Sequence, residues 1–247
     1  MWGYIGRRVL ATIPVLLIVA MLVFLMLRFT PGDPAAVIAG DSATSADIAE
    51  IRAKLGLGGS VVTQFFVWFG NVLQGNFGES FFYKKTVASL IGDRLEPTLA
   101  LATLTIVLAT LIAVPLGTLA AYRQGSWVDR AVMGLSVMGF SVPVFVVGYL
   151  LILVFSLNFG WFPVQGYQRL SEGLWGFLHR LLLPSLTLAI VYIALLARMT
   201  RTSVLEVLNE DYVRTARAKG LPSLKVLIFH ALRNAAVPIV TVIGIGI

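Results

Sequence analysis

Long apolar stretches without a charged residue alternate with shorter polar segments along this chain of 247 residues. A helix needs about 20 predominantly apolar residues to cross the hydrocarbon core of a bilayer. Four charge-free stretches meet or approach that length, namely Val9–Leu27, Thr98–Tyr122, Ala131–Asn158 and Leu181–Ala197. A fifth stretch, Ala235–Ile247, is shorter than a full span, so we expect the chain to end inside a fifth transmembrane helix. The pattern predicts an all-α, polytopic helical membrane protein.

The composition agrees with a membrane protein. Hydrophobic residues make up 58% of the chain and charged residues only 13%, whereas soluble domains contain about 25% charged residues. The absence of cysteine excludes disulfides and thiolate metal sites. The formal net charge of +7 is compatible with nucleic-acid binding, but Lys and Arg also gather on the cytoplasmic side of membrane proteins. The positions of the charges favour the second explanation, and we expect no nucleic-acid partner.

The basic residues are concentrated on one side of the predicted membrane. The N-terminus, the 123–130 loop and the 198–234 loop together hold eleven Lys and Arg residues and four acidic residues. The 30–97 and 159–180 loops together hold seven Lys and Arg residues and eight acidic residues. By the positive-inside rule, the N-terminus and the 198–234 loop are expected to be cytoplasmic.

These assignments describe one transmembrane domain over residues 1–247. Its first helix lies within 1–29, an extracytoplasmic loop region covers 30–97, and core helices occupy 98–247. The first apolar stretch is longer than the roughly 7–15 residues of a signal-peptide core, so we expect it to remain as a helix.

Motifs for several kinds of chemistry are missing from the sequence. The four full spans contain no Asp, Glu, Lys, Arg or His, which are the groups that usually bind coupling ions in self-powered carriers. The sequence has no P-loop and no G-x-S-x-G motif, and its two histidines lie in different loops. We therefore expect no enzyme activity, no metal and no cofactor. An ATP-independent channel or carrier, and a membrane scaffold that transports nothing, remain alternatives.

Small residues and helix breakers mark the second and third spans. Pro115 and Gly117 interrupt the second span, and Ser141 and Pro143 interrupt the third. Small residues let helices approach closely, and a proline inside a span removes one backbone hydrogen bond and bends the helix. These four residues are candidates for a pathway wall that flexes during gating, and tight packing is the alternative.

Two short helices are predicted in the 30–97 region. The first, "SADIAEIRAKLG", begins at a potential capping residue, Ser45, and ends at Gly56. The second, "VVTQFFVWFGNVLQG", begins at Val61 and repeats apolar residues at helical spacing. This pattern is typical of an interfacial helix against the outer leaflet or the bundle, and a docking platform for an external protein is the alternative.

The 198–234 loop contains a dense polar segment, "NEDYVRTARAKGLPSLK" (209–225). Asn209 or Asp211 can cap a short helix, and Gly220 followed by a proline is a typical helix stop. Ser223 can cap a second helix, "LKVLIFHALRN". The small residues of the first helix would let another protein approach closely, with arginines forming charge-assisted bonds at the rim. A solvated amphipathic connector is the alternative.

At this segment the sequence resembles a known family. "DYVRTARAKGL" (211–221) followed by "HALRNAAVP" (230–238) is similar to the coupling loop of ABC-importer permeases, in particular the dipeptide/oligopeptide/nickel permeases. "TPGDPA" (30–35), "NVLQGNFGES" (71–80), "SVPVF" (141–145) and "GWFPVQGY" (160–167) also resemble that family, at its usual places. The resemblance implies the type I ABC-importer transmembrane fold, with about five of its six helices present.

The family's Glu-Ala-Ala-x-x-x-Gly pattern falls on Arg214, Thr215, Ala216 and Gly220, with arginine in place of glutamate. The resemblance implies that the segment docks an ATPase through Tyr212, Arg214, Thr215, Ala216, Arg217, Ala218, Lys219 and Gly220. It also implies a second permease subunit in a heterodimer, two cytoplasmic ATPase subunits and an extracytoplasmic solute-binding protein. The expected function is ATP-driven import of small peptides or related solutes across a bacterial inner membrane. Glutathione and chelated nickel are alternative substrates.

Overall fold

The computed structural model describes residues 2–29, 32–40, 43–54, 56–80 and 83–246. Contacts within the chain divide it into two compact units, Met1–Asp93 and Arg94–Ile247. Each unit is described by itself. The single transmembrane domain over residues 1–247 stays a prediction.

The first unit contains the predicted first span as one continuous helix, α1 (Trp2–Phe29). The predicted amphipathic helix is also confirmed as α4 (Val61–Leu73). Phe24 of α1 is buried against Phe65 and Trp68 of α4, with ring centroids 5.4 and 5.6 Å apart. Helix α4 therefore packs on the C-terminal end of α1.

Two further helices follow α1, namely α2 (Pro34–Ala39) and α3 (Ser45–Lys54). The prediction of α3 and of its stop at Gly56, where φ is +63°, is confirmed. Its capping residue was predicted wrongly, because Thr44 rather than Ser45 accepts the bond from the Asp47 amide, at 3.3 Å. The Asp47 carboxylate accepts in return from the Thr44 amide at 2.9 Å, which completes a capping box.

Asp33 begins α2 by accepting a hydrogen bond from the Ala35 amide at 3.0 Å. The hydrogen bond from Arg52 of α3 lowers the pKa of the Asp33 carboxyl. This residue belongs to the "TPGDPA" motif, of which Thr30 and Pro31 lie outside the described residues. A two-stranded antiparallel ribbon, β1 (Glu79–Ser80) and β2 (Lys85–Thr86), completes this unit.

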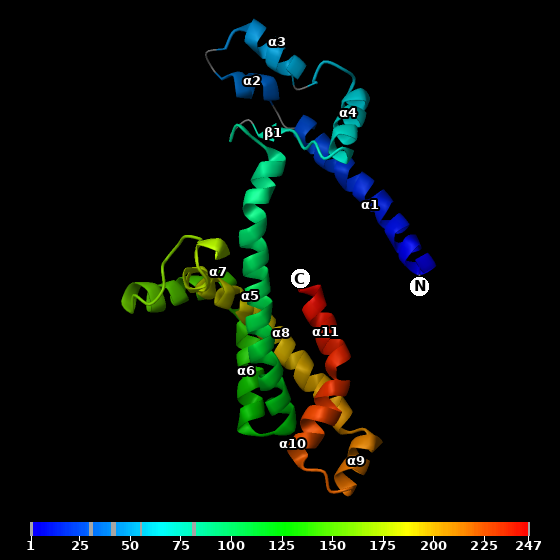
Figure 1. The fold of residues 1–247 in the computed structure, drawn as a ribbon, viewed down its shortest axis with the longest axis vertical. Helices are drawn as coiled ribbons and strands as arrows, with labels where there is room; N and C mark the ends of the chain where they lie inside the picture. The colour runs from blue at the N-terminus through cyan, green and yellow to red at the C-terminus, as the bar shows by residue number, and fades with distance from the viewer. Residues whose placement is uncertain (1, 30–31, 41–42, 55, 81–82, 247) are drawn as a thin grey trace. The chain divides into compact units, whose positions relative to one another are not determined.

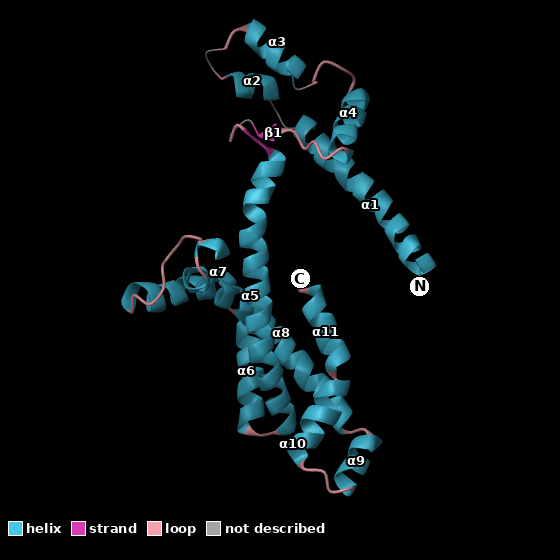
Figure 2. Cartoon of the chain, viewed as in Figure 1, coloured by secondary structure: helices cyan, strands magenta, loops and turns pink. Residues whose placement is uncertain are grey.

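The second unit is helical throughout its regular elements (Figures 1 and 2). Its elements are α5 (Val87–Tyr122), which begins in the first unit, α6 (Trp127–Ser141), α7 (Val144–Leu151), the π-helical η1 (Ile152–Asn158), the 3₁₀ turn η2 (Leu170–Glu172), α8 (Leu174–Leu208), α9 (Asp211–Ala218), α10 (Ser223–Lys225), the π-helical η3 (Val226–Leu232) and α11 (Ala236–Ile245).

Helices α1, α5 and α8 are long and apolar enough to cross a membrane, and two bent helix pairs are candidates for further spans. Both α5 and α8 are longer than the charge-free stretches that predicted them, because their ends carry charged residues. The first eleven residues of the predicted 198–234 loop therefore belong to α8.

The predicted third span, Ala131–Asn158, is not one straight helix. It breaks between α6 and α7, whose continuation through η1 is turned by 103° from α6. Pro143 lacks the amide hydrogen that would continue the helix, and it forces the preceding Val142 into an extended conformation, with φ −88° and ψ 125°.

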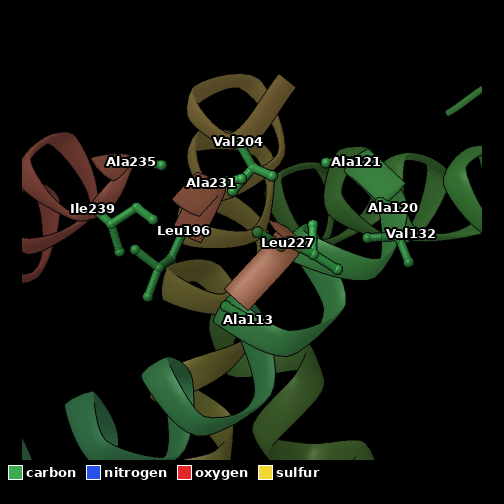
Figure 3. Packing of buried hydrophobic residues seen from close by; sticks show 11 residues of the cluster. Ala113, Ala120, Ala121, Val132, Leu196, Val204, Leu227, Ala231, Ala235 and Ile239 are labelled. Atoms are coloured by element: carbon green, nitrogen blue, oxygen red, sulfur yellow. The ribbon is translucent and has the colours of Figure 1, made fainter. Parts of the chain in front are cut away.

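The core of the second unit lies where α5, α6, α8, η3 and α11 meet (Figure 3). Small side chains fill this core, among them Ala113, Ala120 and Ala121 of α5 and Ala231 of η3, each almost fully buried. Close packing by small residues is the usual way in which helices associate in membranes.

Candidate functional site

The predicted coupling segment forms helix α9, which follows α8 after a two-residue turn. Its N-cap is Glu210, which makes no side-chain capping bond, so the predicted caps were wrong. Asn209 instead donates to the Leu205 carbonyl oxygen at 3.0 Å, and Asp211 pairs with Arg214 at 3.2 Å. Helix α9 therefore begins without a side-chain cap.

The end of α9 is a Schellman motif at Gly220, as the sequence predicted. The Gly220 amide donates to the Arg217 carbonyl oxygen at 2.9 Å, and the Leu221 amide donates to the Ala216 carbonyl oxygen at 3.3 Å. Gly220 has a φ of +79°, which an L-residue with a side chain rarely adopts. A side-chain β-carbon at this position would meet no atom within 4 Å, so the glycine is required for its conformation.

One face of α9 is buried against its own chain. Val213 and Ala216 pack on Val226 at the start of η3, and the partly buried Leu221 packs against the same cluster. Only 7% of Ala216 is exposed, so its side chain does not lie on a surface open to another protein. Ala216 therefore helps to hold α9 on the bundle, and its predicted part in ATPase docking stays a prediction.

The opposite face of α9 is exposed and basic. It carries the other predicted coupling residues, Tyr212, Arg214, Thr215, Arg217, Ala218, Lys219 and Gly220. Among the residues that the structure describes, Arg217 and Lys219 form no ion pair with the chain. These two cations are thus available to an acidic partner surface.

The helix after Gly220 starts differently from the prediction. Its N-cap is Pro222 instead of Ser223, and no side chain caps it. The short α10 continues directly into η3, which turns back to pack on α8. In Figure 1, α9 and the α5–α6 turn lie at the same end of this unit.

Gly117 lies where α5 closely approaches α8. A β-carbon there would be 2.5 Å from the Ala197 carbonyl oxygen and 2.7 Å from the Thr200 β-carbon. Pro115, by contrast, is exposed, and α5 continues through it as one helix. This geometry favours the packing interpretation for Gly117.

Ser141 and Pro143 lie at the bend between α6 and α7. Both are exposed, and the Ser141 hydroxyl donates to the Val137 carbonyl oxygen at 3.0 Å. An apolar cavity of about 320 Å³ adjoins the bend, and its lining includes Val142, Gly139 and Ser136. That the bend flexes during gating stays a prediction.

The structure also shows a pair of residues that sequence reasoning missed. Arg201 of α8 binds both carboxylate oxygens of Asp129 near the start of α6, from Nε at 2.5 Å and from Nη2 at 2.8 Å. The two residues are 72 positions apart, and no local pattern connects them.

Comparison with known proteins identifies the family of this chain. The model of the binding-protein-dependent transport system inner membrane component matches residues 113–247. The model of the N-terminal part of such membrane components matches residues 1–102. The chain belongs to this family.

Curated relatives agree with the family assignment. The chain is 51% identical to a probable peptide ABC transporter permease protein of Sinorhizobium fredii, over 98% of the chain and 78% of the relative. It is 43% identical to a putative peptide transport system permease protein of Brucella abortus, over 99% and 78%. It is 42% identical to a glutathione transport system permease protein of Salmonella typhi, over 99% and 78%.

Membership of this family decides several of the predictions. The chain is the multi-pass, inner-membrane permease subunit of an ABC importer. It is not itself an enzyme, because ATP hydrolysis in this class takes place in separate subunits. Membership of this family implies ATPase and solute-binding partners, and the family description itself names the binding protein.

Proposed function

We propose that this permease subunit imports small peptides or closely related solutes, paired with a second, different permease subunit. The importer contains two cytoplasmic ATPase subunits, of which one docks on the exposed face of α9, and a solute-binding protein delivers the solute from outside. The N-terminus and α9 lie in the cytoplasm. The basic charge at the predicted cytoplasmic loops supports this orientation. The names of the relatives support a peptide-like solute, since glutathione is itself a tripeptide.

The observation that carries the proposal is the two-faced structure of α9. Its inner face is anchored by Val213 and Ala216, while Arg217 and Lys219 are exposed and unpaired among the described residues. A partner that pushes on the outer face therefore moves the anchored helix as a whole. Because only a two-residue turn separates α9 from α8, that movement reaches the bundle core.

Cysteine cross-linking tests the docking surface directly, because the chain contains no cysteine of its own. Arg217→Cys places a thiol on the exposed face of α9, and Trp175→Cys is a matched control at a residue that is 80% exposed at the start of α8. In the assembled importer, only the α9 thiol is expected to cross-link to an ATPase subunit that carries an engineered cysteine. Cross-linking from both positions, or from neither, would contradict the docking model.

The same two variants test sidedness. A membrane-impermeant thiol reagent added to intact spheroplasts is expected to label Trp175→Cys and to leave Arg217→Cys unlabelled until the membrane is opened. The reverse labelling pattern would overturn the proposed orientation.

Transport in proteoliposomes tests the substrate and the need for partners. The complete importer is expected to take up a radiolabelled dipeptide or glutathione only with ATP and the binding protein present. Uptake without ATP would favour the channel or carrier alternative, and uptake of chelated nickel alone would place the chain in the nickel branch.

A further inference from the structure

A buried ion pair joins two helices that the proposed coupling movement must keep together. Asp129 is only 4% exposed, and the Arg201 side chain is 23% exposed. Their two-pronged contact at 2.5 and 2.8 Å fixes the direction of approach as well as the distance. The pair therefore constrains how α8 can rotate or slide against α6.

The same Asp129 carboxylate also closes the turn between α5 and α6. One of its oxygens accepts from the Gly125 amide at 2.9 Å, and the Asp129 amide donates to the Ser126 hydroxyl oxygen at 3.4 Å. Ser126 is the N-cap of α6, and the Asp129 carboxylate reaches one residue further back, to the amide of Gly125. A displacement of Arg201 is therefore passed through one carboxylate to the backbone of the α5–α6 turn.

Arg201 lies close to the end of α8 from which α9 continues. It precedes Leu208 by seven positions, which corresponds to about 10 Å along a helix. Its neighbours Thr200 and Val204 are fully buried, so this part of α8 is held firmly in the core. Movement of α9 reaches Arg201 through a short, rigid segment.

Among the described residues, no cation other than Arg201 forms an ion pair with this carboxylate, although the charge of the neighbouring Arg130 also acts on it. Arg198 stacks over the Phe140 ring, 4.9 Å from its centroid, and Arg130 is exposed. Within the described part of the chain, Arg201 is the cation that binds Asp129. Leaving a buried carboxylate without its partner is strongly unfavourable, so Asp129 and Arg201 are expected to stay paired when the helices move.

We propose that the Asp129–Arg201 pair transmits movement of α9 to the α5–α6 turn and thereby sets how much solute crosses per ATP hydrolysed. This inference rests on the proposed function, because it requires ATPases that act on α9. Asp129 and Arg201 are positioning residues in this scheme, and neither contacts the solute or ATP.

The test compares variants in the complete importer, reconstituted with all partner subunits in proteoliposomes. ATP hydrolysis and uptake are measured in the same vesicles, with whichever of a radiolabelled dipeptide or glutathione the unmodified importer transports. Coupling between distant sites is typically worth a factor of about 5–150, so for Asp129→Asn we expect about a tenfold fall in solute moved per ATP. Hydrolysis itself and the assembly of the complex are expected to persist.

Two further variants make the result specific. Arg130→Gln removes the exposed cation next to Asp129 and is expected to leave the ratio of solute to ATP unchanged. Arg201→Lys keeps the positive charge but loses the planar guanidinium group that binds both carboxylate oxygens at once. We therefore expect a smaller fall in solute moved per ATP than for Asp129→Asn.

The outcomes separate this inference from the proposed function. An unchanged ratio in Asp129→Asn, or failure of both Asp129→Asn and Arg201→Lys to assemble, would show that the pair is only structural and would overturn the inference. Failure of the unmodified complex to couple ATP to uptake would instead refute the proposed function.

Discussion

Replacing Gly117 with alanine is expected to force α5 and α8 apart. The new β-carbon would lie 2.5 Å from the Ala197 carbonyl oxygen and 2.7 Å from the Thr200 β-carbon, whereas ordinary contacts begin near 3.4 Å. The helices must therefore separate locally by up to 0.9 Å, which is 3.4 minus 2.5 Å. Because the closest atom belongs to the backbone, no change of side-chain rotamer can relieve the contact.

The size of the effect follows from two opposing contributions. Inserting a methyl group into a packed core costs about 1–3 kcal/mol. Replacing glycine by alanine inside a helix returns about 0.5–1 kcal/mol, because alanine loses less backbone freedom on folding. The net loss should be about 0–2.5 kcal/mol, which lowers the thermal midpoint of a chain of this size by up to about 10 °C.

Thermal unfolding of the purified chain in detergent, followed by tryptophan fluorescence, measures this loss. Gly134→Ala is the matched control, because Gly134 is also inside a helix but has no atom within 4 Å of the new β-carbon. Gly139→Ala should lie between the two, since its β-carbon would be 3.0 Å from that of Ala194. If Gly117→Ala unfolded at the temperature of Gly134→Ala or above, the close crossing of α5 and α8 would be refuted.

Three further substitutions test other features of the chain. Gly220→Ala should destabilise the end of α9 by about 1 kcal/mol, because the φ of +79° at this position is unfavourable for alanine. Gly220→Asn should retain more ATPase docking than Gly220→Ala in a pull-down, because asparagine tolerates that conformation. Weaker docking by Gly220→Asn than by Gly220→Ala would show that the size of the side chain matters instead. Thr200→Val should leave the thermal midpoint unchanged or raise it, because the buried Thr200 hydroxyl has no hydrogen-bond partner among the described residues. A clear fall in the midpoint would contradict this reasoning. Asp33→Asn should reduce hydrogen-exchange protection of α2 and α3 at pH 7. The hydrogen bond from Arg52 lowers the pKa of Asp33 from 3.8. The stabilisation of α2 and α3 by this bond is therefore complete above pH 3.8 and disappears as the pH falls through the lowered pKa. If Asp33→Asn reduced the protection equally at a pH below the lowered pKa, the role of the charged Asp33 carboxylate would be refuted.

Features with a local physical cause could be predicted from the sequence. The stops of α3 at Gly56 and of α9 at Gly220 both appear where a glycine ends a helical pattern, and both have positive φ. The long helices α1, α5 and α8 follow from charge-free length alone. Only their exact ends were missed, because a helix can continue through charged residues once it leaves the hydrocarbon core.

Pro143 marks the position of the break in the third span, but the sequence does not show how far the chain turns there. Pro115 and Pro184 lie inside continuous helices, so a proline alone does not predict a break. At Pro143 the chain turns, and α7 then packs on α8. The packing is close at Gly148, where the β-carbon of an alanine would lie 3.2 Å from a methyl group of Thr187. This contact joins residues 39 positions apart, from 148 to 187, so no local window contains it.

The candidate site shows the same division between local and distant causes. The composition of α9 indicated a helix with small and basic residues, but it could not show which face is covered. The apolar residues Val213 and Leu221 mark the buried face, and Ala216 lies with them. The small residue that was expected to meet a partner therefore meets its own chain.

The charges at this end of the second unit divide into two groups with different consequences. Asp129 and Arg201 satisfy each other inside the protein, where salt screens the interaction only weakly. Arg217 and Lys219 are exposed and have no ion-pair partner within the described chain, so their contribution depends on a second protein and on ionic strength. Arg217 and Lys219 therefore add positive charge to the exposed surface, whereas the Asp129–Arg201 pair is neutral as a unit. A surface that binds α9 should accordingly be acidic, and its push should reach the α5–α6 turn through a contact that salt weakens much less than it weakens the docking.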